Sequence, residues 1–185
     1  MGDSAYIATR IRQPGVIAHT GTRAHLQFGA LLPSQHPQAD AFLAACRQAG
    51  VNAELVHDIV RANWEKFVLL VGMSSATAVT RKPIATVRAD ADIRWLFEQT
   101  MRETWHLARK RGIELPDDFV ESRLAFAETL HTEMRASLLH DLEAGHKLEA
   151  PWLCGAVARM SAQAGLDAPV NRAVFAALKP YLDGR

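Results

Sequence analysis

The sequence predicts a mainly α-helical protein that begins with a small antiparallel β segment. Before residue 30, short runs of strand-forming residues alternate with turn-forming residues. From residue 57 onward, apolar residues recur at helical spacing, and most of these segments end at a glycine or a proline. The chain has 185 residues, of which 49% are hydrophobic and 22% charged, so it has the composition of a globular protein and the length to bury a core.

The expected β segment occupies residues 1–35. Residues 5–11, 16–19 and 24–28 are predicted to form three short strands, because turn-forming residues separate them at positions 14–15 and 21–23. A meander of three short strands is too small to be stable without a partner layer. We therefore expect it to be the end of a larger domain, followed by a helical domain at residues 36–185.

The helical domain is expected to contain one further strand, at residues 51–56. Asp58 is placed to cap the N-terminus of a long helix that contains Lys66, and Pro83 ends that helix. The expected helices cover residues 38–49, 58–82, 90–111, 116–127, 137–144, 148–164 and 170–181.

Residues 64–81 form the expected central helix. No charge occurs in residues 67–79, so this helix is apolar or small on every face, which is typical of a helix buried in a core. The run is too short to span a bilayer, and three hydroxyl side chains interrupt it. Lys66 stands where the charged approach ends and the apolar run begins. Its amine could act as a proton donor in partly desolvated surroundings, or its stem could pack while the amine reaches water.

Composition excludes several other classes of function. The formal net charge is +1 and no block of basic residues occurs, so neither nucleic acid nor an acidic membrane surface is an expected partner. Cys46 and Cys154 lie in apolar helical segments without metal-ligand spacing, so they are expected to be buried thiols, and no metal site is expected. The N-terminus lacks the pattern of a secretory signal, and a cytoplasmic protein is the expectation.

Several short motifs follow one another along the chain in a specific order. They are Pro14-Gly15-Val16-Ile17, Ala49-Gly50, Asp58-Ile59, Trp64-Glu65-Lys66-Phe67, the run from Ser137 to Gly145, Leu148-Glu149, Gly155 and Pro169-Val170-Asn171. This order resembles the ketopantoate reductase family over nearly the whole chain from about Ala5. The resemblance implies NADPH-dependent reduction of a 2-oxo acid, either 2-dehydropantoate to pantoate in pantothenate biosynthesis or a related substrate.

The resemblance also implies a fold. Members of the family have a helical substrate-binding and dimerisation domain of the 6-phosphogluconate dehydrogenase-like type, which follows a Rossmann nucleotide-binding domain. The β segment of this chain resembles only the last strands of the Rossmann domain, and the chain contains no Gly-x-Gly-x-x-Gly. NADPH is therefore the implied cofactor, while its main binding domain is missing from the sequence, and we expect the isolated chain to be inactive.

The resemblance assigns roles to particular residues. Lys66 matches the catalytic lysine that protonates the carbonyl oxygen as hydride arrives at the adjacent carbon. Ser137 matches a substrate-contacting serine, and Glu149 matches a glutamate that helps to bind substrate and cofactor. From the residues alone, Ser137 could instead cap the helix that follows it, and Glu149 could simply favour the start of the next helix. Asp141 matches a family aspartate whose expected role is structural.

The sequence departs from the family at two positions near the lysine. Pantoate-forming members place asparagines one and two turns beyond it, where this chain has Leu70 and Ser74. We keep Ser74 as an expected substrate-binding residue, although losing the amides removes hydrogen bonds that a polar substrate needs. The identity of the 2-oxo acid is thus left open.

Two classes of function remain. The first is a reductase in which this chain supplies the catalytic and substrate-binding domain. The alternative is a non-catalytic binding or dimerisation module derived from that domain. In either case we expect a homodimer, because the exposed cleft wall and the open strand edge both favour pairing with another copy.

Overall fold

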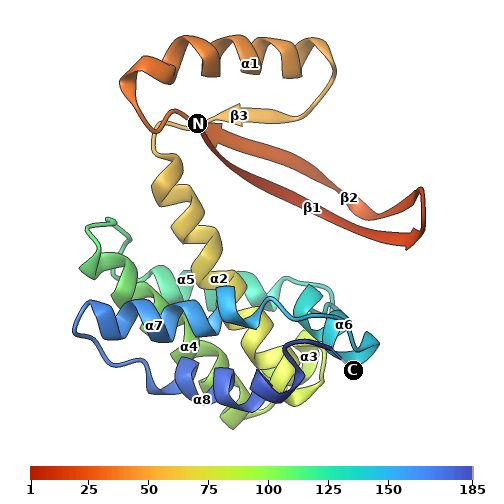
Figure 1. Ribbon diagram of the computed structural model, residues 1–185, viewed down its shortest axis with the longest axis vertical. Helices are drawn as coiled ribbons and strands as arrows, with labels where there is room; N and C mark the ends of the chain where they lie inside the picture. Colours follow the sequence, from red (N-terminus) through yellow and green to blue (C-terminus); the bar gives the residue numbers. More distant parts are fainter. Residues whose placement is uncertain (185) are drawn as a thin grey trace. The chain divides into compact units, whose positions relative to one another are not determined.

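The computed structural model describes residues 1–184, with the side chains of all of them except residues 8, 10 and 20–23. The chain forms two compact units, Met1–Asn63 and Trp64–Arg185. Figure 1 labels their helices and strands. Within the part of the chain that the structure describes, no helix has the length and apolar character needed to cross a membrane.

The first unit contains a β-hairpin, one short strand and one helix. Strands β1 (Gly2–Gln13) and β2 (Val16–Gly29) pair antiparallel, and Gly15 in the turn between them has a φ of 81°, which glycine adopts easily. Strand β3 (Ala53–Leu55) pairs parallel with β2. A short 3₁₀ helix, η1 (Pro33–Gln35), leads into α1 (His36–Gln48). Helix α1 packs against the sheet, with the ring centroids of Phe42 and Phe28 4.8 Å apart.

The hairpin replaces the expected meander of three short strands. Residues 16–19 and 24–28 belong to one strand, β2, and its pairing with β1 shifts register between Ile7 and Thr9. The side chains of residues 21–23, where a turn was expected, lie outside those described. Because α1 and β3 both pack with β2, the first compact unit extends to Asn63, whereas the expected boundary lies between residues 35 and 36.

The second unit is helical, as the sequence predicts from residue 57 onward. Its first helix, α2 (Ile59–Thr80), starts in the first unit. The following α-helices are α3 (Ile84–Ala89), α4 (Ala91–Lys110), α5 (Phe119–Glu128), α6 (Ser137–Ala144), α7 (Cys154–Gln163) and α8 (Pro169–Leu178). Two 3₁₀ helices, η2 (Ala150–Trp152) and η3 (Lys179–Tyr181), lie before α7 and after α8.

Capping residues place several of these helices where the sequence predicts. The Asp58 carboxylate accepts the N–H of Arg61 at 2.9 Å at the start of α2, as expected of an N-cap. The Asp90 carboxylate accepts two N–H groups at the start of α4. The range expected for α6 is confirmed at both ends, and Gly145 follows it with a φ of 69°.

Three helical segments differ from the prediction. Helix α3 was not expected, because six residues are too few to show helical periodicity. Helix α5 starts at Phe119 instead of Pro116. Residues 116–119 form a turn before the helix, in which the Pro116 carbonyl accepts the N–H of Phe119. The helix expected at residues 148–164 is split into η2 and α7, because Leu153 has φ −105° and ψ −108°, outside the helical region.

Helix α2 is the central element of the second unit. All residues from 71 to 78 are buried, and in the stretch 68–73 only Leu70 is exposed. Two hydrophobic clusters contact α2. The α5 cluster joins Val68, Met73 and Ala76 to apolar residues of α3, α4 and α5. The α7 cluster joins Val71 and Ala78 to Leu107, Leu138, Leu142, Leu148, Ala150, Leu153, Cys154, Val157, Ala168, Val174 and Leu178. The predicted central helix is confirmed.

Gly72 allows α2 and α4 to approach closely. A Cβ added at Gly72 would lie 2.5 Å from Cγ of Met101 and 2.8 Å from Cε2 of Phe97. The side chains of Met101 and Phe97 are both buried in the α5 cluster, where neighbouring groups leave them little room to move.

Replacing Gly72 with valine should therefore destabilise the second unit by about 2 kcal/mol through overpacking. Urea unfolding followed by circular dichroism measures this loss. Ala125→Val is the matched control, because Ala125 is exposed on α5 and its substitution should cost about 0.5 kcal/mol or less. A Gly72→Val protein as stable as the unchanged chain would contradict the close approach of α2 and α4.

Glu103 of α4 supplies the cap for the N-terminus of α8. Its carboxylate accepts the backbone N–H groups of Val170 and Asn171 and the Asn171 side-chain amide, each at 2.8 Å. The fully buried Asn171 also donates to the Thr100 carbonyl at 3.1 Å. Helix α8 has no side-chain cap of its own at Ala168, so a carboxylate from another helix satisfies its first N–H groups.

Glu103→Ala should lower the free energy of unfolding by about 2–3 kcal/mol, because three donors lose their acceptor in a partly buried setting. Thermal unfolding measures the change. Glu98→Ala is the control on the same helix, since Glu98 forms a partly exposed i,i+4 pair with Arg102, and such pairs contribute about 1 kcal/mol or less. Equal effects of the two substitutions would contradict the capping role of Glu103.

Candidate active site

Lys66 lies in the N-terminal half of α2, just after the second unit begins at Trp64. Its side chain is partly buried, at the start of the fully apolar part of the helix, as the sequence predicts. Residues four apart on a helix lie one above the other, so Lys66, Leu70 and Ser74 form one line along α2. This line enters the core beyond Leu70, because Leu70 is 37% exposed and Ser74 only 1%.

Ser137 is the first residue of α6, and its side chain is exposed. The capping position belongs to Ala136, and no side-chain cap is formed there. The hydroxyl of Ser137 is therefore not used as a helix cap, which was the structural alternative to a role in binding. The next residue, Leu138, is buried in the α7 cluster and holds this end of α6 in place.

Glu149 lies directly before η2, and its side chain is exposed. Its backbone carbonyl accepts the N–H of Trp152 at 2.8 Å, while its carboxylate forms no cap. Helix α7 begins only at Cys154, so Glu149 does not sit at an α-helix N-terminus as the structural alternative supposed. The residues on both sides of it, Leu148 and Ala150, are buried in the α7 cluster.

The α7 cluster brings the three segments together. Trp64 and Phe67, which flank Lys66 on α2, pack against this cluster, and Leu138, Leu148 and Ala150 are among its buried members. Trp64 and Phe67 also contact each other edge to face, with ring centroids 5.6 Å apart. One hydrophobic cluster therefore fixes the backbone beside Lys66, beside Ser137 and on both sides of Glu149.

Ser74 differs from the other three residues, because its side chain is buried within the second unit. Its Oγ has no hydrogen-bond partner among the described residues. A buried hydroxyl without a partner costs about 1–3 kcal/mol, which is unusual in a packed interior. Its position on the line that starts at Lys66 is as the sequence predicts, whereas its access to a substrate stays a prediction.

Asp141 closes the end of α6. Its backbone carbonyl accepts the N–H of His146 at 2.8 Å, and its carboxylate lies 3.3 Å from Nδ1 of the same histidine. These contacts follow Gly145 and shape the turn that leads to Glu149. A structural role explains this arrangement.

The buried Cys154 thiol is poorly suited to thiolate chemistry. Burial raises the pKa of the Cys154 thiol to about 11, so this thiol is protonated at neutral pH and is a poor nucleophile. Its Sγ instead donates to the Ala150 carbonyl at 3.6 Å. No group of three or more His, Cys, Asp or Glu residues is placed to hold a metal ion within the described part of the chain.

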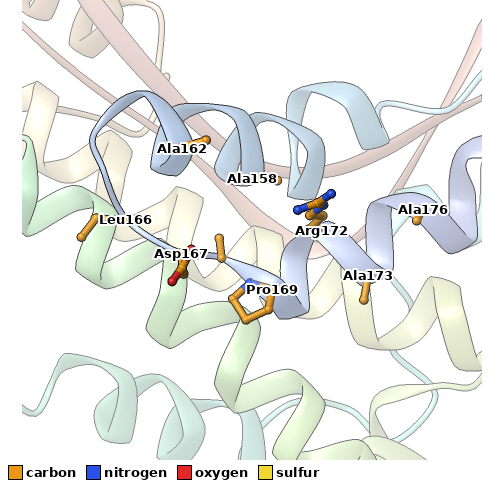
Figure 2. A pocket seen from close by; sticks show the side chains of 9 residues that line it. Ala158, Ala162, Leu166, Asp167, Pro169, Arg172, Ala173 and Ala176 are labelled. Atoms are coloured by element: carbon orange, nitrogen blue, oxygen red, sulfur yellow. The ribbon is translucent and has the colours of Figure 1, made fainter.

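A separate groove of about 490 Å³ lies between α7 and α8. Figure 2 shows Arg172 and Asp167 among small apolar side chains in this groove. None of the residues that the sequence predicts for the site lines it. Alanines account for five of its lining positions, at 158, 162, 168, 173 and 176.

Comparison with known proteins identifies the family. Residues 58–182 match the family described as ketopantoate reductase PanE/ApbA C terminal. Because this match covers more than half of the sequence, the chain belongs to the ketopantoate reductase family. The resemblance seen in the sequence and the mainly helical fold are both confirmed.

Individual relatives show how much of the family's length is present. Uncharacterized oxidoreductase YkpB of Bacillus subtilis is 24% identical over 183 residues, which cover 98% of this chain and 60% of that protein. The 2-dehydropantoate 2-reductase of Nostoc sp. is 27% identical over 137 residues, covering 74% and 42%. The crystal structure of 2-dehydropantoate 2-reductase from Geobacter metallireducens has a TM-score of 0.86 at 25% identity, covering 97% and 60%. The chain thus spans between 42% and 60% of the length of these relatives.

Trp152 is a candidate site residue that the sequence did not single out. It is 71% exposed on η2, three residues after Glu149. The sequence alone predicts an unbroken helix here, in which this tryptophan has no special position. Pro151, directly before it, is the one signal of a break.

Proposed function

We propose that this chain supplies the substrate-binding and proton-donating part of a reductase that converts 2-oxo acids to 2-hydroxy acids with NADPH. Family membership supports the class of reaction. The observation that carries the proposal is the packing of the segments of Lys66, Ser137 and Glu149 around the α7 cluster.

Lys66 is the proposed proton donor. Hydride addition to a ketone builds negative charge on its oxygen, and an ammonium group close to that oxygen stabilises the charge and then gives up a proton. A lysine that is partly buried beside an apolar helix face suits this role, because the reduced water content strengthens its interaction with the oxyanion.

Ser137 and Glu149 are the proposed binding residues. The serine hydroxyl can donate a hydrogen bond to a carboxylate of the substrate. The Glu149 carboxylate, when ionised, only accepts hydrogen bonds, so it suits hydroxyl or amide groups of the substrate and the cofactor. Ser74 is the fourth proposed residue; it lies two turns beyond Lys66 on α2, and its buried hydroxyl has no hydrogen-bond partner among the described residues.

In this proposal the pyrophosphate of NADPH is bound elsewhere than on residues 1–184. Such a site needs a glycine-rich turn from a parallel strand into a helix N-terminus with free N–H groups. After β3, the N-terminus of α2 is capped by the Asp58 carboxylate, which would repel a phosphate. After β2, α1 begins with His36 and Pro37, and a proline has no N–H to donate. In this proposal, therefore, a nucleotide-binding half outside residues 1–184 holds the cofactor.

The homodimer stays a prediction. Ile11 and Ile17 pair with each other on the hairpin and are 77% and 71% exposed, so contact with another copy would bury apolar surface there.

Lys66→Ala should lower the turnover number by about a hundredfold or more, because the lysine's proton is delivered chiefly in the transition state. The assay uses a chain in which a nucleotide-binding half of the family precedes residues 1–185, and follows the loss of NADPH absorbance with a series of 2-oxo acids. The dissociation constant for NADPH should change little. Glu149→Ala should raise KM as well as lower kcat.

Lys82→Ala is the matched control, because Lys82 is exposed just after α2 and should be replaceable without loss of rate. Residues 1–185 alone should not oxidise NADPH. If the extended chain folds and binds NADPH yet reduces none of the 2-oxo acids, or if Lys66→Ala keeps the full rate, the non-catalytic module replaces this proposal.

A further inference from the structure

Trp152 presents a large aromatic side chain at the surface beside Glu149. The residues around it are held firmly: Ala150 is fully buried, and Leu153 is 7% exposed, whereas Trp152 is 71% exposed. The backbone N–H of Trp152 donates to the Glu149 carbonyl at 2.8 Å, so one turn of 3₁₀ helix fixes the relative positions of the two residues. An exposed tryptophan on a rigid segment is typical of a binding position, because the ring offers a large contact area at low cost in conformational entropy.

Leu70 presents an apolar side chain one turn beyond Lys66. It is 37% exposed, while its neighbour Val71 is fully buried in the α7 cluster. On the helix, Leu70 lies between Lys66 and the face of α2 that carries Phe67 and Val71. The side chain next to the proposed proton donor is therefore apolar and open to contact.

Leu70 and Trp152 are each followed in sequence by a buried member of the α7 cluster, Val71 and Leu153. Segment 148–154 and the face of α2 between Trp64 and Val71 both pack into this cluster. Lys66 and Leu70 lie beside it on α2, and Glu149 and Trp152 are the exposed residues of the second segment. The residues next to members of this cluster thus include one cationic, one anionic and two apolar side chains.

We propose that the 2-oxo acid bound at this site carries an apolar side chain, alkyl or aryl. This side chain contacts Leu70 and Trp152 while the Lys66 ammonium contacts the oxygen of the oxo group. This inference rests on the proposed function and adds no chemical step to it. Leu70 offers no hydrogen bond to a polar substituent, and burying an amide or hydroxyl against it without a partner is unfavourable. An alkyl or aryl group loses nothing there and gains the contact area of the indole ring.

The test uses two acids of nearly equal shape. The alkyl acid, 4-methyl-2-oxopentanoate, ends in an isopropyl group, and the amide acid, 4-amino-2,4-dioxobutanoate, has a carboxamide in its place. Their dissociation constants for residues 1–185 are measured by ligand-observed NMR. The alkyl acid should bind roughly tenfold or more tightly than the amide acid. Leu70→Asn should remove this preference or reverse it, and Trp152→Ala should weaken the alkyl acid by about tenfold while leaving the amide acid unchanged.

Two variants serve as controls. Trp95→Ala removes another tryptophan, 55% exposed on α4, and should leave both acids unaffected. Lys66→Ala should weaken both acids alike, because it removes the charge that attracts the groups they share.

The outcomes separate this inference from the proposed function. If neither acid binds and the extended chain reduces no 2-oxo acid, the proposed function fails and this inference with it. If both acids bind with equal affinity, or the amide acid binds better, only the inference that the substrate carries an apolar side chain is overturned. Trp152→Ala could also convert a dimer to a monomer in sedimentation while leaving the preference for the alkyl acid intact. That result would overturn the inference, because it would assign the indole ring to an interface between copies.

Discussion

The burial of α2 between two hydrophobic clusters is the constraint on which the second unit depends. The helix can be surrounded in this way because residues 67–79 carry no charge. Its hydroxyl residues do not all disturb the core, since Thr77 donates to the Met73 carbonyl and Thr80 to the Ala76 carbonyl, each at 2.7 Å. A charge in this stretch would be desolvated without a partner, which proteins rarely tolerate.

The same burial gives the candidate site its rigidity. The proposed residues Lys66, Ser137 and Glu149 are not in the core themselves, but each is next to a residue that packs into the α7 cluster. Reactive groups on well-packed helices and turns are held more accurately than groups on free loops. A function that needs three side chains from distant parts of the sequence can therefore use positions that this core holds in place.

Local patterns in the sequence predict much of this fold and less of the site. Helix α6 and the caps of α2 and α4 follow from residues within one turn of each helix end, so they can be read directly. The long hairpin and the break at Leu153 depend on pairing and packing with other segments, which periodicity does not report. The position of Lys66 follows from its place at the edge of an apolar run, whereas the roles of Ser137 and Glu149 came only from resemblance. The exposure of Trp152 could not be predicted, because it results from that break.

The central claim is that the α7 cluster, through α2, holds the site segments in place. Val71 and Val68 allow a matched test, because both are fully buried on α2 but belong to different clusters. Amide hydrogen exchange should show that Val71→Ala speeds exchange at residues 137–142 and 148–154, and that Val68→Ala speeds it at residues 119–128 instead. If both substitutions affect the same residues, or if Val71→Ala leaves residues 148–154 unchanged, the cluster does not hold the site together.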